Sequence, residues 1–156
     1  MMVERGFTDW HLAIAGDGKS EYRASLSTLV QKLSLGGKID FLGQIVGKAK
    51  EELYEDADVF IVPSHRESFC IAIAEALAHG VPVIASKYAP WPRLVDERCG
   101  LWVENSSSSL ANAILEAESM PLRDMGNRGR AWIEREFSWK VSTERVLATY
   151  AEMKGK

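Results

Sequence analysis

The chain has 156 residues, of which 46% are hydrophobic and 26% charged, and this composition predicts one globular domain with a packed core. Its net charge of -3 argues against a general nucleic-acid-binding protein and against binding to anionic membranes, because both need a basic surface. Two cysteines make no disulfide framework and three histidines show no metal-ligand spacing, so we expect a cytoplasmic protein without a metal or other cofactor. No apolar run is long enough for a transmembrane segment, and the N-terminus lacks the apolar core of a signal peptide.

Short apolar runs alternate with helical patterns along the chain. The runs that predict strands lie at residues 10–15, 39–42, 58–62, 82–86 and 100–103. The helical patterns lie at 26–33, 48–56, 68–79, 108–118, 122–136 and 138–154, and serines 106–109 predict a capped helix start. This order predicts an α/β fold, a Rossmann-like, doubly wound parallel sheet with C-terminal helices, in one domain over residues 1–156.

Ligands of doubly wound sheets bind outside the carboxyl ends of the strands. The loops of interest are therefore 16–18, 43–47, 63–69 and 86–92. Gly16 and Gly18 close the first strand, but a lone G-x-G pattern is equally a simple tight turn. The full dinucleotide pattern is absent, because Glu21 occupies its last position.

Glu75 lies inside the apolar segment 70–78, which predicts a core helix. A buried carboxylate without a partner is costly, so Glu75 needs an ion pair, a cap-type hydrogen bond, an open edge or a ligand. We favour a ligand, because unusual carboxylates often mark binding sites.

Glu67 precedes Glu75 by eight positions. If both were helical, they would lie about 12 Å apart along the axis, a spacing that suits two contacts to an extended ligand. Taken alone, Glu67 is typical of an exposed loop. Ser68, Phe69 and Cys70 lie at the expected helix start, where free amides and the helix dipole favour phosphate, although Ser68 is equally a plain N-cap.

Several motifs occur together in a fixed order. They are Ala15-Gly16-Asp17-Gly18, Phe41-Leu42-Gly43, residues 57–64, Glu67-x-Phe69, residues 75–86 including Glu75-Ala76-Leu77-Ala78, Ala89-Pro90-Trp91, residues 99–103 and Phe137-Ser138-Trp139. This set resembles the C-terminal, nucleotide-sugar-binding domain of family-four retaining GT-B glycosyltransferases, whose E-x7-E motif Glu67 and Glu75 match. The form of the motifs is similar to a subgroup of lipopolysaccharide-core and other cell-surface glycan transferases.

The resemblance implies a transferase that moves a hexose from a nucleotide-diphosphate sugar to a glycan or glycolipid acceptor, with retention and without a bound metal. It implies that Glu75 binds the ribose hydroxyls and that Glu67, as the catalytic-centre residue, contacts the donor sugar. The backbone at Phe69, Cys70 and Ile71, next to Ser68, would face the diphosphate or hexose. The turn from Gly43 to Ile45 would lie beside the base, and Gly16 and Gly18 would line the same donor site.

The sequence also departs from the family pattern. Cys70 stands where glycine is usual, and Arg93 stands where an acidic residue is usual. The family domain normally opens with a strand, a loop carrying an Arg and a Lys that bind the diphosphate, and a helix, and this chain begins after them. By the resemblance, the acceptor-binding N-terminal domain is missing too, so we expect the isolated chain to be inactive without it. That domain would also be the route to any peripheral contact with the inner membrane surface.

These departures leave an alternative open, a degenerate, non-catalytic Rossmann-like module that binds a partner. An incomplete sheet would expose an edge for the missing domain or for self-association. A third possibility is a related GT-B enzyme, such as a sugar-nucleotide epimerase or a glycogen-synthase-like polymerase.

Overall fold

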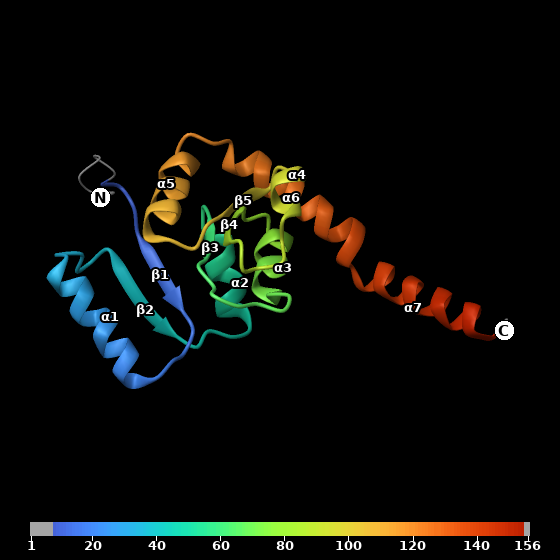
Figure 1. Cartoon of the computed structure of the whole chain (residues 1–156), viewed down its shortest axis with the longest axis horizontal. Coiled ribbons are helices and arrows are strands. Elements are labelled where there is room, and N and C mark those ends of the chain that lie inside the picture. Colours follow the sequence, from blue (N-terminus) through green and yellow to red (C-terminus); the bar gives the residue numbers. More distant parts are fainter. Residues whose placement is uncertain (1–7, 155–156) are drawn as a thin grey trace. The chain divides into compact units, whose positions relative to one another are not determined.

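The computed structural model describes residues 8–154, which fall into two compact units, one ending at Glu52 and the other beginning at Leu53. Each unit has its own parallel sheet (Figure 1). The strands are β1 (Leu12–Ala15), β2 (Ile39–Gly43), β3 (Phe60–Val62), β4 (Val83–Ser86) and β5 (Gly100–Val103). The helices are α1 (Ser20–Lys32), α2 (Lys48–Glu55), α3 (Ile71–Ala78), α4 (Arg93–Asp96), α5 (Ser107–Ala117), α6 (Leu122–Phe137) and α7 (Trp139–Lys154).

The first unit is a small β1–α1–β2 arrangement. β1 and β2 pair in parallel from Leu12 opposite Ile39 onward, with a shift in register after Ile14. Side chains alternate between half-buried and exposed along both strands, and α1 has no buried residue. Of the described residues up to 52, none is fully buried, so this unit has no dry core of its own.

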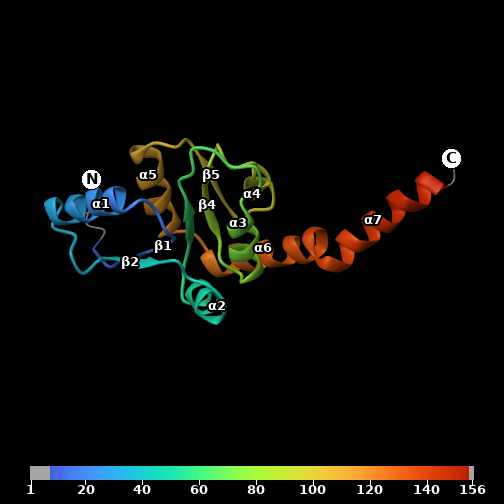
Figure 2. The ribbon, with the colours of Figure 1, turned by 90° about the horizontal axis from the view of Figure 1, so that it is seen from below.

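The second unit contains a three-stranded parallel sheet in the order β3-β4-β5. The central strand β4 is buried along its whole length, because both of its faces are covered. Val83 and Ala85 join a core cluster with α3 and α6, whereas Ile84 joins a second cluster with α5. Figure 2 shows α3 and α5 on opposite sides of β4 and β5. Covering of both faces by helices is typical of parallel sheets in α/β proteins.

Helices α3 and α6 pack together at glycine positions. A Cβ atom on Gly126 would lie 1.7 Å from the carbonyl oxygen of Gly80, and one on Gly129 would lie 2.6 Å from a methyl carbon of Leu77. No side chain fits at Gly126 unless the helices move apart. Met125, Trp132 and Ile133 fill the rest of this buried face of α6.

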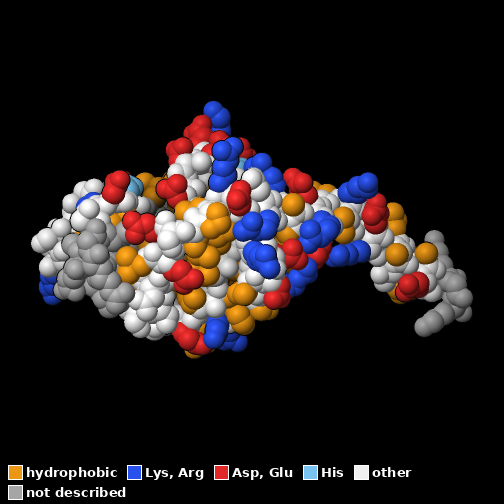
Figure 3. All heavy atoms as spheres, turned by 90° about the horizontal axis from the view of Figure 1, so that it is seen from above, with side chains coloured by type: hydrophobic (Ala, Val, Ile, Leu, Met, Phe, Trp, Pro, Cys, Tyr) orange, Lys and Arg blue, Asp and Glu red, His pale blue; other side chains and the backbone are white. Residues whose placement is uncertain are grey.

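Helix α7 extends away from the three-stranded sheet (Figure 1). Most of its large apolar residues are exposed, and Trp139 is 89% accessible. Figure 3 shows hydrophobic side chains interspersed with charged ones along this helix. Among residues 8–154, no helix is both long and apolar enough to cross a membrane.

The sequence patterns place most elements within a few residues of their observed bounds, with four differences. The helix expected from Ser68 begins only at Ile71, and α4 was not predicted. The strands pair as two separate parallel sheets. Helix α3 is also not covered on all sides, since Ile71 is 67% accessible.

Candidate functional site

The candidate site in the second unit is built at the carboxyl ends of β3, β4 and β5. These strands end at Val62, Ser86 and Val103, and their parallel pairing brings the three ends to one edge of the sheet. The loop that follows β3, residues 63–70, carries Glu67 and leads into α3. We refer to it as the β3–α3 loop.

The first half of the β3–α3 loop is held by side chains from the neighbouring strand ends. The Ser86 hydroxyl donates to the carbonyl oxygen of Ser64 at 2.5 Å. The Asn105 amide donates to the carbonyl oxygens of Pro63 and Ser64 at 3.3 and 3.1 Å, and lies 3.2 Å from Nδ1 of His65. Ser86 is completely buried, so its hydroxyl needs a protein partner. These bonds fix the backbone at Pro63 and Ser64, three to four residues before Glu67.

The second half of the loop is held by Trp91, which lies between β4 and α4. The Trp91 indole N–H donates to the carbonyl oxygen of Phe69. Trp91 is only 3% accessible, and its ring lies 5.1 Å from Phe69, 5.5 Å from Trp132 and 5.6 Å from Phe137, between ring centroids. Ring packing and a hydrogen bond therefore act on the same short segment of backbone.

Glu67 itself is half-buried, and one carboxylate oxygen accepts a hydrogen bond from the Ser64 hydroxyl at 2.8 Å. This bond spans the loop and orients the carboxylate. Glu67 is therefore not the fully exposed loop carboxylate that is typical of such a position.

The helix start differs from the expectation at Ser68. Cys70 is the N-cap of α3, with φ 65° and ψ 76°, in the left-handed region that favours glycine. Ser68 and Phe69 lie before the helix, and Phe69 is tied to Trp91 in a non-helical conformation. The first helical amides therefore belong to Ile71 and its successors. Burial and the neighbouring carboxylate of Glu67 raise the pKa of the Cys70 thiol, which keeps it neutral beside this helix end.

Glu75 lies on α3 and is half-buried. The single hydroxyl proton of Tyr54 is shared between Oε2 of Glu75 and the carbonyl oxygen of Ala72, both at 3.3 Å from the hydroxyl oxygen. The Tyr54 ring in turn stacks on His79, with centroids 5.4 Å apart. Burial, followed by the charge of Glu75, raises the pKa of the Tyr54 hydroxyl, so it stays protonated as a donor. The half-buried Glu75 carboxylate, for which we expected a partner, thus has Tyr54 as one hydrogen-bond donor.

The other expected site residues are placed in the first unit. Gly16 has φ 134° and Gly43 has φ 69°, and both φ values favour glycine. The amide of Gly16 donates to the carbonyl oxygen of Gly43 at 2.7 Å, so the two expected turns meet at the end of the β1–β2 sheet. Gly18 has room for a side chain, since a Cβ atom added there would have no neighbour within 4 Å, and Ile45 is half-buried.

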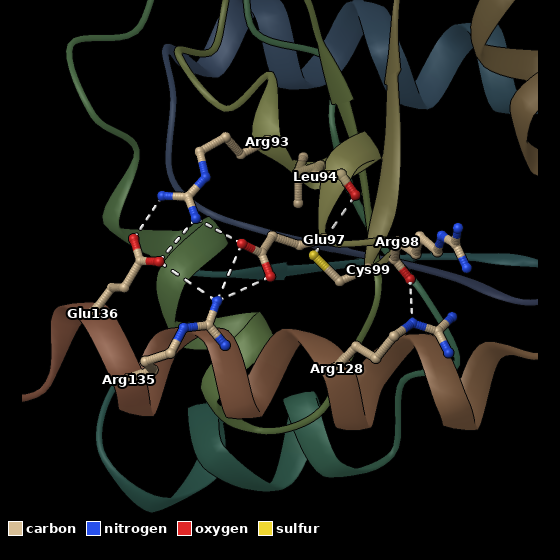
Figure 4. Close-up of polar contacts among 8 residues, drawn as sticks. All are labelled: Arg93, Leu94, Glu97, Arg98, Cys99, Arg128, Arg135 and Glu136. Atoms are coloured by element: carbon tan, nitrogen blue, oxygen red, sulfur yellow. Dashed lines mark hydrogen bonds and ion pairs between the residues drawn. The ribbon is translucent and has the colours of Figure 1, made fainter.

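Arg93, the position that departs from the family pattern, is the centre of an ion-pair cluster between α4 and α6 (Figure 4). Its guanidinium contacts Glu136 at 2.6 and 2.8 Å and Glu97 at 2.6 Å. Arg135 reaches Glu97 at 3.0 Å and Glu136 at 3.4 Å. The Arg93 hydrogen bonds lower the pKa of Glu136 to about 2. Arg93 therefore forms ion pairs that link α4 to α6, whereas the acidic residue usual at this position in the family is absent.

The sequence patterns do not mark Tyr54 or Asn105 as site residues, and they mark Ser86 only as the first residue of the loop 86–92. Their contacts join positions 18 to 42 residues apart, which no local pattern reveals. The one available signal was position, because Ser86 and Asn105 follow strands whose carboxyl ends form the expected ligand edge. No group of three or more His, Cys, Asp or Glu side chains within residues 8–154 is arranged to hold a metal ion.

A sequence profile of the family described as "Glycosyl transferases group 1" matches residues 2–132. A D-inositol 3-phosphate glycosyltransferase of Saccharomonospora viridis is 34% identical over 144 residues, which are 88% of this chain and 32% of that protein. A GDP-mannose-dependent monoacylated alpha-(1-6)-phosphatidylinositol monomannoside mannosyltransferase of Corynebacterium glutamicum is 34% identical over 148 residues, covering 88% of this chain and 38% of the relative.

Among solved structures, a sucrose-phosphate synthase from Thermosynechococcus elongatus superimposes with a TM-score of 0.78 at 31% identity. The match covers 92% of this chain and 38% of the synthase. The chain thus spans about a third of the length of these relatives.

Proposed function

This chain belongs to the glycosyl transferases group 1 family, and from that premise we propose that it is the donor-binding part of a retaining glycosyltransferase. The donor is a nucleotide-diphosphate sugar, and a hexose is transferred to a glycan or glycolipid acceptor. The observation that carries the proposal is the β3–α3 loop, whose backbone is held by hydrogen bonds from Ser86, Trp91 and Asn105. Glu67 lies on this loop, and Glu75 lies on the helix that follows it. Because the chain spans about a third of its curated relatives, we assign only the donor side of the reaction to these residues.

Each residue of the site has a chemical task in this proposal. Glu75, oriented by Tyr54, accepts hydrogen bonds from the ribose hydroxyls, and Glu67, oriented by Ser64, accepts them from the sugar. The backbone from Phe69 to Ile71 faces the donor. The amides at the start of α3, from Ile71 onward, face the diphosphate, because amides at a helix start favour negative charge, and Phe69 faces the hexose. A neutral Cys70 thiol adds no repelling charge there.

The remaining expected residues belong to the nucleotide end of the donor. Gly43 and Ile45 lie beside the base, and Gly16 and Gly18 belong to the adjoining turn. Ser68 supports the phosphate-facing backbone. These assignments, the retention of configuration, the lipopolysaccharide-core-like subgroup and a location at the cytoplasmic side of a membrane rest on the resemblance and remain proposals.

The test is a thermal-shift titration with UDP, GDP, ADP and their sugar conjugates, on the wild type, Glu75→Gln and the control Glu134→Gln. Glutamine keeps an acceptor for Tyr54, so the fold is retained, but it loses the charge-assisted bonds to the ribose. We expect one base to raise the melting temperature in a concentration-dependent way, with the rise reduced in Glu75→Gln and unchanged in Glu134→Gln, which is exposed on α6.

The proposal fails if a cooperatively melting wild type shows no shift with any of these ligands. The alternative, a non-catalytic module that binds a protein partner, would then be favoured. Arg93 motivates that alternative, since its ion pairs serve the packing of α4 on α6. A wild-type shift that is the same in Glu75→Gln would keep a nucleotide site but remove Glu75 from it.

A further inference from the structure

The β3–α3 loop is held from outside at both ends, but by different parts of the protein. Ser86 and Asn105 hold its beginning, at the carbonyl oxygens of Pro63 and Ser64. Only Trp91 among the described contacts holds the carbonyl oxygen of Phe69, on the helix side of Glu67. The geometry on that side of the carboxylate therefore depends on where Trp91 is placed.

The placement of Trp91 depends in turn on helix α6. The ring of Trp91 packs against Trp132 and Phe137 of α6, with centroids 5.5 and 5.6 Å away. Two residues further on, Arg93 binds Glu136 of the same helix, and its guanidinium carbon lies 5.0 Å from the centroid of the Trp132 ring. The segment 91–93 is thus fixed to α6 by an apolar contact at one end and an ion pair at the other.

We propose that Trp91 and Arg93 are positioning residues that transmit the position of α6 to the β3–α3 loop and so set the affinity for the sugar part of the donor. The route runs from Glu136 through Arg93 and Trp91 to the carbonyl oxygen of Phe69. Neither residue touches the sugar in this proposal. The inference rests on the proposed donor site, in which Glu67 contacts the sugar and Glu75 contacts the nucleotide.

Separate contacts for the two parts of the donor lead to a distinctive expectation. Glu75 lies on α3 and is oriented by Tyr54, whose ring contacts are to Phe60 and His79 and whose hydrogen bonds are to α3, with no direct contact to Trp91 among them. Loosening the loop at Phe69 therefore weakens contacts to the sugar and leaves contacts to the nucleoside diphosphate largely intact. A merely structural role for Trp91 would reduce the stability of the unit and weaken both ligands alike.

The first experiment uses Trp91→Phe, which keeps an aromatic ring and removes the N–H donor, with Trp139→Phe as the matched control on exposed α7. Binding is measured by calorimetry for the nucleotide sugar and for the matching nucleoside diphosphate. We expect Trp91→Phe to weaken the nucleotide sugar by roughly three- to tenfold, the range for one lost hydrogen bond, and the diphosphate by less than about twofold. Trp139→Phe changes neither. Equal weakening of both ligands would overturn the proposal.

A second readout needs no ligand. Arg66 is an exposed trypsin site inside the β3–α3 loop, and Arg123 is an exposed site on α6. We expect Trp91→Phe to accelerate cleavage after Arg66 by several-fold without accelerating cleavage after Arg123. If both rates rise together, or neither rises, Trp91 does not hold the loop. This readout decides the positioning role even if the wild type binds no nucleotide, an outcome that would refute the donor site alone.

The part played by Arg93 is tested by Arg93→Gln, Arg93→Lys and the double variant Trp91→Phe/Arg93→Gln. We expect Arg93→Gln to raise the Arg66 cleavage rate less than Trp91→Phe does, and Arg93→Lys to restore part of the difference, since lysine keeps the charge but not the planar fork. Because both residues act on Phe69 in series, the double variant should behave like Trp91→Phe alone. Additive effects would mean that Arg93 acts independently of Trp91.

Discussion

At the residue scale, the most informative position is Cys70, a residue with a side chain in a left-handed backbone conformation. That conformation costs a non-glycine residue roughly 1–2 kcal/mol. The loop retains it because Phe69 is fixed by Trp91 on one side while the helix begins on the other. Strain at this place sits directly between Glu67 and the first amides of α3.

At position 70 we therefore expect glycine to be more stabilising than alanine, the reverse of their usual order in a helix. We expect Cys70→Gly to be more stable than Cys70→Ala by about 1 kcal/mol in urea denaturation, because only glycine relieves the left-handed conformation. At Ala131, an exposed position in the middle of α6, the ranking is normal, and Ala131→Gly should lose about 1 kcal/mol. An alanine variant at least as stable as the glycine variant would show that position 70 is not strained.

Glu136 predicts a pH dependence. Its pKa is lowered to about 2 in the folded protein by Arg93, from the ordinary value of 4.5, so its contribution to stability is fully present above about pH 4.5. The contribution is lost as the pH falls from there toward 2. We expect the difference in melting temperature between the wild type and Glu136→Gln to be constant from pH 5 to 7 and to shrink below pH 4. A difference that stays constant down to the lowest pH tolerated would contradict the assigned pairing.

At the scale of elements, the packing of α3 on α6 decides the stability of the second unit. An exposed helical glycine is normally improved by alanine by about 1 kcal/mol. At Gly126 we expect alanine to lower stability instead, because the added Cβ would lie only 1.7 Å from the carbonyl oxygen of Gly80. Backbone cannot move aside as a side-chain tip can.

We accordingly expect Gly126→Ala to destabilise the protein by about 1–3 kcal/mol or more, measured by urea denaturation. Gly18→Ala is the control, since no atom lies within 4 Å of its added Cβ. The control should change stability by less than about 0.5 kcal/mol. Stabilisation by Gly126→Ala would mean that the two helices are not in close contact at this point.

The positions of helices and strands were the features that the sequence predicted best. Buried strands such as β4 and amphipathic helices such as α6 carry their burial pattern in local periodicity, so both were predicted almost to the residue. Helix α4 was missed because it is one short turn after Pro92, with too few residues to show a period. The start of α3 was misplaced because Ser68 is a typical N-cap residue and apolar residues follow it, while the left-handed backbone at Cys70 has no local sequence signal.

The candidate site was less predictable than the fold for a related reason. Glu67 and Glu75 stand out in the sequence by their spacing and their apolar surroundings. Tyr54, Ser86 and Asn105, which orient them or their loop, belong to other elements and become neighbours only through the sheet. The role of Arg93 was likewise invisible, because its partner Glu136 is 43 positions away.

At the scale of the whole molecule, the two units differ in how they are stabilised. The second unit has two buried core clusters, one on each face of its sheet. The first unit, over its described residues, buries no side chain completely and relies on a two-stranded parallel sheet, which is marginal in water. Burial of apolar surface is the main source of stability, so the units should not be equally protected against opening.

Hydrogen exchange monitored by mass spectrometry checks this difference. We expect amides of β1 and β2 to exchange through local opening, well before amides of β4, which exchange only on unfolding of the second unit. Destabilising the second unit with Gly126→Ala should accelerate exchange in β4 and leave β1 nearly unchanged. Equal protection of β1 and β4 would show that the first unit is stabilised as strongly as the second.

The hydrogen bonds that hold the β3–α3 loop have a consequence for protein engineering. Its three external donors, Ser86, Trp91 and Asn105, come from later parts of the chain than the loop itself. Transplanting residues 63–70 into a related enzyme would carry Glu67 and its partner Ser64 across but leave behind the three side chains that hold the loop. A chimera that exchanges 63–70 together with these three side chains should retain the donor preference of its source, whereas the loop alone should not.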